Sequence, residues 1–233
     1  MDEQHYQNLM SAIETRHAVR SYTDKPLPAS LVEQLQREVD ACNEESGLHM
    51  QLVVEDTDAF VNGMAHFGKF TGVRNYLALV GKKSEKLQEA VGYYGERVTL
   101  LAQVLGLNSC WVAMTFSKGS AKQHCTIDPG EKLVCVVSLG YGETQGVPHK
   151  VKPLEELYQA EGNVPDWFLN GMKAAQLAPT AVNQQKFRFT LDGDTVRAEA
   201  LGGSYDEVDL GIVECHFEIG ARRKCFDLAA HRG

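Results

Sequence analysis

The sequence predicts an α+β fold in which helices alternate with short strands along the chain. Apolar residues recur at helical spacing over residues 6–13 and again over 31–39, after a proline-rich turn at 26–30. Residues 133–139 are continuously apolar and rich in β-branched side chains, as expected for a strand buried on both faces. An Asp-Gly pair at 192–193 separates two strand-like runs, which is a strong signal for a β-hairpin. Helix and strand therefore occur in both parts of the chain.

The other elements follow from the same periodicities. We expect strands over residues 48–54, 76–80, 187–191 and 195–201, and helices over 87–105, 166–177 and 208–226. Gly106 can end the long apolar helix before it, because glycine readily adopts a left-handed backbone. The order of helix, two strands and long helix occurs twice along the chain. We interpret this repetition as a degenerate internal duplication.

Composition bounds the class of protein. At 233 residues the chain buries enough apolar surface to fold without disulfides, and its six cysteines form no CxxC pair, so reduced thiols in the cytoplasm are expected and a metal site is not. The N-terminus is polar and unlike a signal peptide, and no apolar run approaches the length of a membrane span. The net charge of -8 disfavours nucleic-acid binding but allows a local basic pocket for one small anion.

Two basic segments could form such a pocket. Residues 16–22 read Arg-His-Ala-Val-Arg-Ser-Tyr, and Lys150 and Lys152 alternate on an extended segment, so that both can face one phosphate. Each charge-assisted hydrogen bond to a phosphate contributes roughly 1.5–3 kcal/mol. A solvated basic turn is the alternative for any short arginine-rich segment taken alone.

Three further segments complete a recurring pattern. They are residues 105–114 (Leu-Gly-Leu-Asn-Ser-Cys-Trp-Val-Ala-Met), 136–142 (Val-Val-Ser-Leu-Gly-Tyr-Gly) followed by 150–156, and 178–185 (Ala-Pro-Thr-Ala-Val-Asn-Gln-Gln). A dinucleotide-binding glycine loop at 140–146 is excluded because prolines, rather than a helix, follow it. Together with residues 16–22, these segments resemble the FMN-dependent nitroreductase family, and within it the internally duplicated, pseudo-dimeric subgroup. The resemblance covers nearly the whole chain.

The resemblance implies a nitroreductase-like fold with a central, mainly antiparallel sheet flanked by helices, and a set of cofactor contacts. The residues implied at the FMN phosphate are Arg16, His17, Ala18, Arg20, Lys150 and Lys152. Those implied at the flavin ring are Ala113 and Met114, near atom N5, together with Pro179, Thr180, Asn183 and Gln185. Amide side chains suit the ring edge, because it alternates hydrogen-bond donors and acceptors.

The catalytic centre implied by the resemblance is flavin N5 itself. Glu96 is the one carboxylate considered as a catalytic group, against the alternative of an ordinary helix charge. Cys110 is not expected to act as a nucleophile, because no partner base is identifiable.

The sequence departs from the family pattern in an informative way. Ala18 replaces the usual serine, Lys186 a proline and Phe187 a tryptophan. Residues 42–50 lack the Ala-Pro-Ser-Asn segment, whereas the second part carries that segment without a basic loop before it. We therefore expect a pseudo-dimer of two intertwined halves, in which residues 1–160 supply the phosphate site and residues 161–233 supply the ring contacts of one FMN.

The function implied is an FMN-dependent NAD(P)H oxidoreductase. A nicotinamide cofactor would reduce the flavin and leave, and a small-molecule acceptor such as a quinone or nitroaromatic would then take the electrons in a ping-pong cycle. The alternatives are an FMN-binding or flavin-sensing protein without turnover, and a structural domain whose motifs are coincidental. The acceptor, the choice between NADH and NADPH, and the choice between a monomer and a homodimer stay open.

Overall fold

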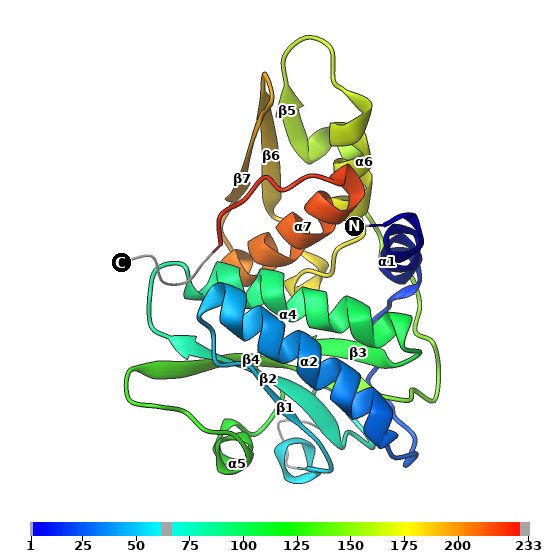
Figure 1. Cartoon of the computed structure of the whole chain (residues 1–233), viewed down its shortest axis with the longest axis vertical. Helices are drawn as coiled ribbons and strands as arrows, with labels where there is room; N and C mark the ends of the chain where they lie inside the picture. The colour runs from blue at the N-terminus through cyan, green and yellow to red at the C-terminus, as the bar shows by residue number, and fades with distance from the viewer. Residues whose placement is uncertain (1, 62–66, 229–233) are drawn as a thin grey trace.

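The computed structural model of the chain describes residues 2–61 and 67–228 (Figure 1). Its α-helices are α1 (Glu3–Thr15), α2 (Ala29–Ser46), α4 (Leu87–Val104), α5 (Lys118–His124), α6 (Asp166–Gln176) and α7 (Asp206–Ala221). Its strands are β1 (Gln51–Val53), β2 (Asn75–Lys82), β3 (Asn108–Val112), β4 (Glu131–Gly140), β5 (Tyr158–Ala160), β6 (Phe187–Asp192) and β7 (Thr195–Ala200). The expected mixture of helix and mainly antiparallel sheet is confirmed.

The strands are divided between two sheets. In the first, β1, β2, β4 and β3 pair in that order and all run antiparallel to their neighbours. In the second, β6 pairs in parallel with β5 and antiparallel with β7. Strand β4 is buried along nearly its whole length, as its apolar sequence predicts. The Asp-Gly hairpin is confirmed, because Asp192 pairs with Thr195 across the turn.

Helices α4 and α7 cross at the centre of the molecule, between the two sheets (Figure 1). Gly92 and Gly211 allow this close approach: a Cβ atom on Gly92 would collide with the Val208 carbonyl oxygen, and one on Gly211 would collide with that of Glu89. Each glycine thus faces the carbonyl three residues before the other. Reciprocal contacts of this kind are typical of surfaces related by a two-fold axis.

Two element boundaries differ from the prediction. The last helix ends at Ala221 instead of Phe226, because Arg222 adopts a left-handed backbone with φ 53°. The strand expected over 48–54 is confined to β1, since the residues after the turn at Gly47 first bond to the end of α2. Within the described residues, no helix combines the length and hydropathy that a membrane span requires.

Candidate functional site

The basic loop after α1 lies along the edge of the first sheet. Ala18 forms a parallel bridge with Ser109 of β3, and the Val19 amide donates to the Ser109 carbonyl at 3.0 Å. Tyr22 bridges to Gly142 beyond the end of β4. The fold therefore brings residues 16–22, the start of β3 and the Gly-Tyr-Gly turn together, although they lie far apart in the sequence.

Arg16 enters the interior beside a buried carboxylate. Its side chain is 2% exposed, and its Nε lies 3.7 Å from Oε1 of Glu96, which is fully buried. Glu96 also accepts a hydrogen bond of 2.7 Å from Trp111 Nε1 and contacts His216 Nε2 at 2.8 Å. His216 Nδ1 in turn donates to the Ala174 carbonyl at 3.1 Å. Glu96 thus balances the charge of Arg16 and links α4 to α7 and α6, and its carboxylate does not reach solvent.

The exposed positive charges of the predicted phosphate site are Arg20 and Lys150. The Arg20 guanidinium lies 5.9 Å from the ring centroid of Phe70, within the range of a cation–π contact. His17 is half-buried, and burial together with the charge of Arg16 lowers its pKa. Ala18 is exposed and offers only its backbone. Among these cations, the side chains of Arg20 and Lys150 therefore reach solvent, whereas that of Arg16 does not.

Three buried polar atoms in this region have no hydrogen-bond partner. They are Arg16 Nε, Ser109 Oγ and His149 Nε2. Ser109 is the bridge partner of Ala18, so a free hydroxyl lies next to the position where the family serine is missing. Burial lowers the pKa of His149, and the nearby charges of Arg16 and His216 add to this effect. The unpaired Arg16 Nε and Ser109 hydroxyl can both donate, so they fit a polar, anionic ligand such as the phosphate of FMN.

The segment that carries the predicted ring contacts is hydrogen-bonded to the second basic segment. Gln185 is buried; its Nε2 donates to the Lys150 carbonyl at 2.9 Å and its Oε1 accepts from the Lys152 amide at 2.8 Å. Lys152 Nζ donates to the Gln185 carbonyl at 2.9 Å, and Asn183 Nδ2 donates to the Lys150 carbonyl at 2.9 Å. The side chains of Gln185, Asn183 and Lys152 are therefore engaged within the protein, whereas Thr180 and Pro179 are half-buried.

The backbone of this segment is strained. Val182, Asn183 and Gln185 have φ angles of 47°, 55° and 47°, which place three non-glycine residues in the left-handed region. Val182, a β-branched residue that rarely adopts such angles, is 95% exposed. Strain in a segment that also carries the ring-contact pattern indicates that the surrounding structure holds it in place.

Asp209, in the first turn of α7, provides one such support. Its carboxylate accepts the Ala181 amide at 2.8 and 3.0 Å and Gln184 Nε2 at 2.7 Å. The side chain is buried, and burial raises its pKa to about 6. No sequence pattern marks Asp209 or His216, because both act through residues remote in the chain.

Ala113 and Met114 follow β3 directly. Ala113 is half-buried and Met114 is 63% exposed, so an apolar side chain and a backbone segment are available to a flat ligand. Cys110 is buried, and burial raises the pKa of its thiol, which is consistent with a residue that does not react. All six cysteines are free thiols.

The two groups of contacts adjoin one another. Gln176 Nε2, at the end of α6, donates to the Lys152 carbonyl at 2.7 Å. His149, next to Lys150 in the chain, lies close enough to Arg16 and His17 for their charges to lower its pKa. The structure thus places the segments containing the predicted contacts in one region. Not all of the predicted side chains face an open space, because those of Gln185, Asn183 and Lys152 are hydrogen-bonded within the protein.

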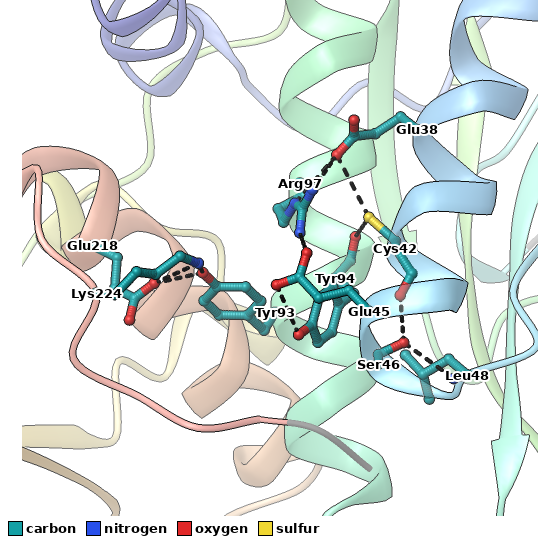
Figure 2. Close-up of polar contacts among 10 residues, drawn as sticks. All are labelled: Glu38, Cys42, Glu45, Ser46, Leu48, Tyr93, Tyr94, Arg97, Glu218 and Lys224. Atoms are coloured by element: carbon teal, nitrogen blue, oxygen red, sulfur yellow. Dashed lines mark hydrogen bonds and ion pairs between the residues drawn. The ribbon is translucent and has the colours of Figure 1, made fainter. Parts of the chain in front are cut away.

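Two cavities lie elsewhere. One of about 520 Å³ opens between α1, α2, α4 and the end of α7, and another of about 580 Å³ lies beside Tyr22 and Gly72. At the first, Arg97 reaches from α4 toward Glu38 and Glu45 of α2, with N···O distances of 2.9 and 2.6 Å (Figure 2). None of the predicted FMN contacts lines either cavity.

Solved structures share this fold. A putative nitroreductase from Thermotoga maritima aligns with a TM-score of 0.64 at 20% identity, over 95% of this chain and 87% of that one. Proteins described as putative NADH dehydrogenase/NAD(P)H nitroreductase align over 64% of this chain and 95% of their own. Their TM-scores are 0.51 for Parabacteroides distasonis, at 17% identity, and 0.50 for Bacteroides thetaiotaomicron, at 18%. At these identities the likeness shows the fold.

The sequence itself matches a family over most of its length. The chain has no detectable relative among curated proteins. Residues 8–221 match the family described as "Putative TM nitroreductase". The expected nitroreductase resemblance is therefore confirmed, and the chain belongs to this nitroreductase family.

Proposed function

We propose that this protein is an FMN-dependent NAD(P)H oxidoreductase of the nitroreductase type that binds its flavin between two parts of one chain. The observation that carries the proposal is the joining of Lys150 and Lys152 to Gln185 by three hydrogen bonds. These bonds hold a basic segment of the first part against the ring-contact segment of the second. A phosphate site and a ring site thereby become adjacent without a second subunit.

Two features support a division into residues 1–160 and 161–233. The order of α6, β6, β7 and α7 in the second part repeats that of α2, β1, β2 and α4 in the first. The reciprocal contacts of Gly92 and Gly211 are those expected where two related long helices meet. The pseudo-dimer would thus replace the interface of two subunits by the α4–α7 crossing.

The residues of this chain would then have distinct tasks. Arg20 and Lys150 are exposed cations that can hold the phosphate, while Ser109 and His149 offer unpaired polar atoms beside it.

Glu96 keeps the buried charge of Arg16 compensated, which maintains the loop in position. Met114 presents an exposed apolar surface that can exclude water from one ring face. When bound, FMN supplies hydride transfer between a nicotinamide and a small-molecule acceptor.

Stopped-flow absorbance tests the oxidoreductase function. The FMN-loaded protein is mixed anaerobically with NADH and, separately, with NADPH, and loss of the oxidised flavin band is followed. We expect rapid bleaching by at least one of them, followed by recovery on adding a quinone or a nitroaromatic. A flavin that stays oxidised with both donors would contradict turnover and favour the FMN-binding or flavin-sensing alternative.

A further inference from the structure

The ring-contact segment has an anchor outside itself. The strained residues Val182, Asn183 and Gln185 follow Ala181, whose amide donates to both carboxylate oxygens of Asp209. Gln184, which lies between the strained residues, donates to the same carboxylate at 2.7 Å. A single buried side chain of α7 therefore receives hydrogen bonds from two points of a left-handed turn.

We propose that Asp209 is the positioning residue that holds residues 180–185 in the conformation that meets the flavin, an inference that rests on the proposed function. Asp209 acts through the backbone and is not itself a flavin contact. Its role is to keep the amide of Ala181 and the side chain of Gln184 fixed while the residues between them stay in an unfavourable conformation.

A carboxylate suits this task better than a neutral side chain. It offers acceptors only, so both oxygens can receive donors at once, and hydrogen bonds to an ionised group are stronger than those between neutral groups. Because non-glycine residues disfavour the left-handed region, the turn would relax toward ordinary angles once these bonds are lost. The position of Asp209 in the first helical turn adds the favourable end of the α7 dipole.

The surroundings of Asp209 oppose its charge. Burial raises its pKa to about 6, against the hydrogen bonds from Gln184 and Ala181 that lower it, and Asp206 of the same helix raises it further. The charge of Asp209 also raises the pKa of the Cys135 thiol on β4, and the Asp209 amide donates to the Tyr205 carbonyl at 2.9 Å. An ionised group retained despite this burial reduces stability near neutral pH. A loss of stability of this kind is typical of a residue that is kept for function.

The test compares Asp209→Ala with Asp206→Asn, a change in the same helical turn that leaves the anchor intact. Hydrogen–deuterium exchange of the segment 180–185 is measured without flavin, and FMN affinity is measured by flavin fluorescence. In Asp209→Ala we expect exchange at the Ala181 amide to become at least about tenfold faster and FMN to bind about tenfold more weakly, since charged hydrogen bonds are lost. Asp206→Asn should change neither.

A second pair of variants separates anchoring from general damage. Asp209→Asn keeps the side-chain volume and one acceptor, so it should show smaller effects in the same direction even if the alanine variant folds poorly. Val182→Gly combined with Asp209→Ala should recover part of the FMN affinity, because glycine adopts a positive φ without strain. A purely structural role for Asp209 predicts no such recovery.

Unchanged exchange at 180–185 in both Asp209 variants, or unchanged FMN affinity despite faster exchange, would overturn the positioning role. Faster exchange in Asp209→Ala together with a wild-type protein that binds no FMN would contradict the proposed function while supporting the anchor.

Discussion

Helices α2 and α6 occupy comparable places in the chain and are held in different ways. Each follows an extended segment and precedes a strand of a sheet, β1 in one case and β6 in the other. Helix α2 is tied to α4 by Arg97, whose partners Glu38 and Glu45 are 27% and 48% exposed (Figure 2). Helix α6 is tied to α7 by His216, which is fully buried and donates to the Ala174 carbonyl of α6. The other ring nitrogen of His216 contacts Glu96 of α4.

The segments that follow the two helices differ as well. After α2, Gly47 takes the left-handed conformation with φ 74°, and the Asn43 side chain closes the turn on Met50. After α6, the left-handed residues are Val182, Asn183 and Gln185, and they depend on bonds from α7 and from the 150–152 segment. The first turn satisfies itself, whereas the second requires the rest of the molecule.

The two segments differ in whether folding alone explains their shape. A relaxed glycine turn needs no support and is explained by folding alone. A strained turn fixed by buried polar groups is explained more simply by a task that demands its shape. This strain supports the proposal that residues 180–185 contact the flavin ring.

The largest expected effect comes from removing the buried carboxylate on which α6 depends. Glu96→Ala leaves Arg16 without a counter-charge and takes a partner from Trp111 and His216, so we expect a loss of roughly 3–5 kcal/mol in the free energy of unfolding. Urea denaturation measures it. The matched change beside α2, Glu45→Ala, removes a half-exposed ion pair and should cost less than about 1 kcal/mol. Equal losses of unfolding free energy in the two variants would contradict the proposed difference between the attachments of α2 and α6.

A second prediction concerns pH. The pKa of Asp209 is raised from 3.8 to about 6 in the folded protein, so the folded state holds the proton more tightly than the unfolded one. Relative to Asp209→Asn, the wild type should therefore lose about 3 kcal/mol of stability as the pH rises from about 3 to about 7, and show no further relative change above that. Denaturation curves of both proteins at several pH values measure this difference. A relative gain with rising pH would show that Asp209 is not a desolvated acid.

The smallest effects come from exchanging the backbone preferences of the two turns. Gly47→Ala should destabilise the protein by about 1 kcal/mol, because an L-residue is forced to a positive φ. Val182→Asn should leave stability unchanged or raise it by up to about 1 kcal/mol, because asparagine tolerates the left-handed region better than valine. Thermal unfolding compares the two. A clear loss in Val182→Asn would mean that the turn at 182 is not strained.

Local patterns predicted the elements well. The Asp-Gly hairpin, the strand at 133–139 and the end of the long helix near Gly106 depend on neighbouring residues alone, and each is confirmed. The last helix was predicted too long because nothing in the sequence signals the left-handed turn at Arg222, a residue that is not a usual helix terminator.

The site was harder to read for a physical reason. The motif at residues 16–22 implied that Arg16 lies at the phosphate. In the structure its buried ion-pair partner is Glu96, eighty residues later. Alternation predicted that Lys150 and Lys152 can both face one phosphate, yet Lys152 Nζ donates to the Gln185 carbonyl, a contact that only the fold creates. Long-range pairing decides which motif residues stay free, and a single sequence does not contain it.

The flavin content of the purified protein tests the central claim most directly. Absorbance spectra after reconstitution give the number of FMN molecules per chain, with Arg20→Ala and the exposed control Arg37→Ala measured alongside. We expect one FMN per chain, weaker retention in Arg20→Ala and wild-type retention in Arg37→Ala. Two flavins per chain, or none, would contradict a single site shared between the two halves.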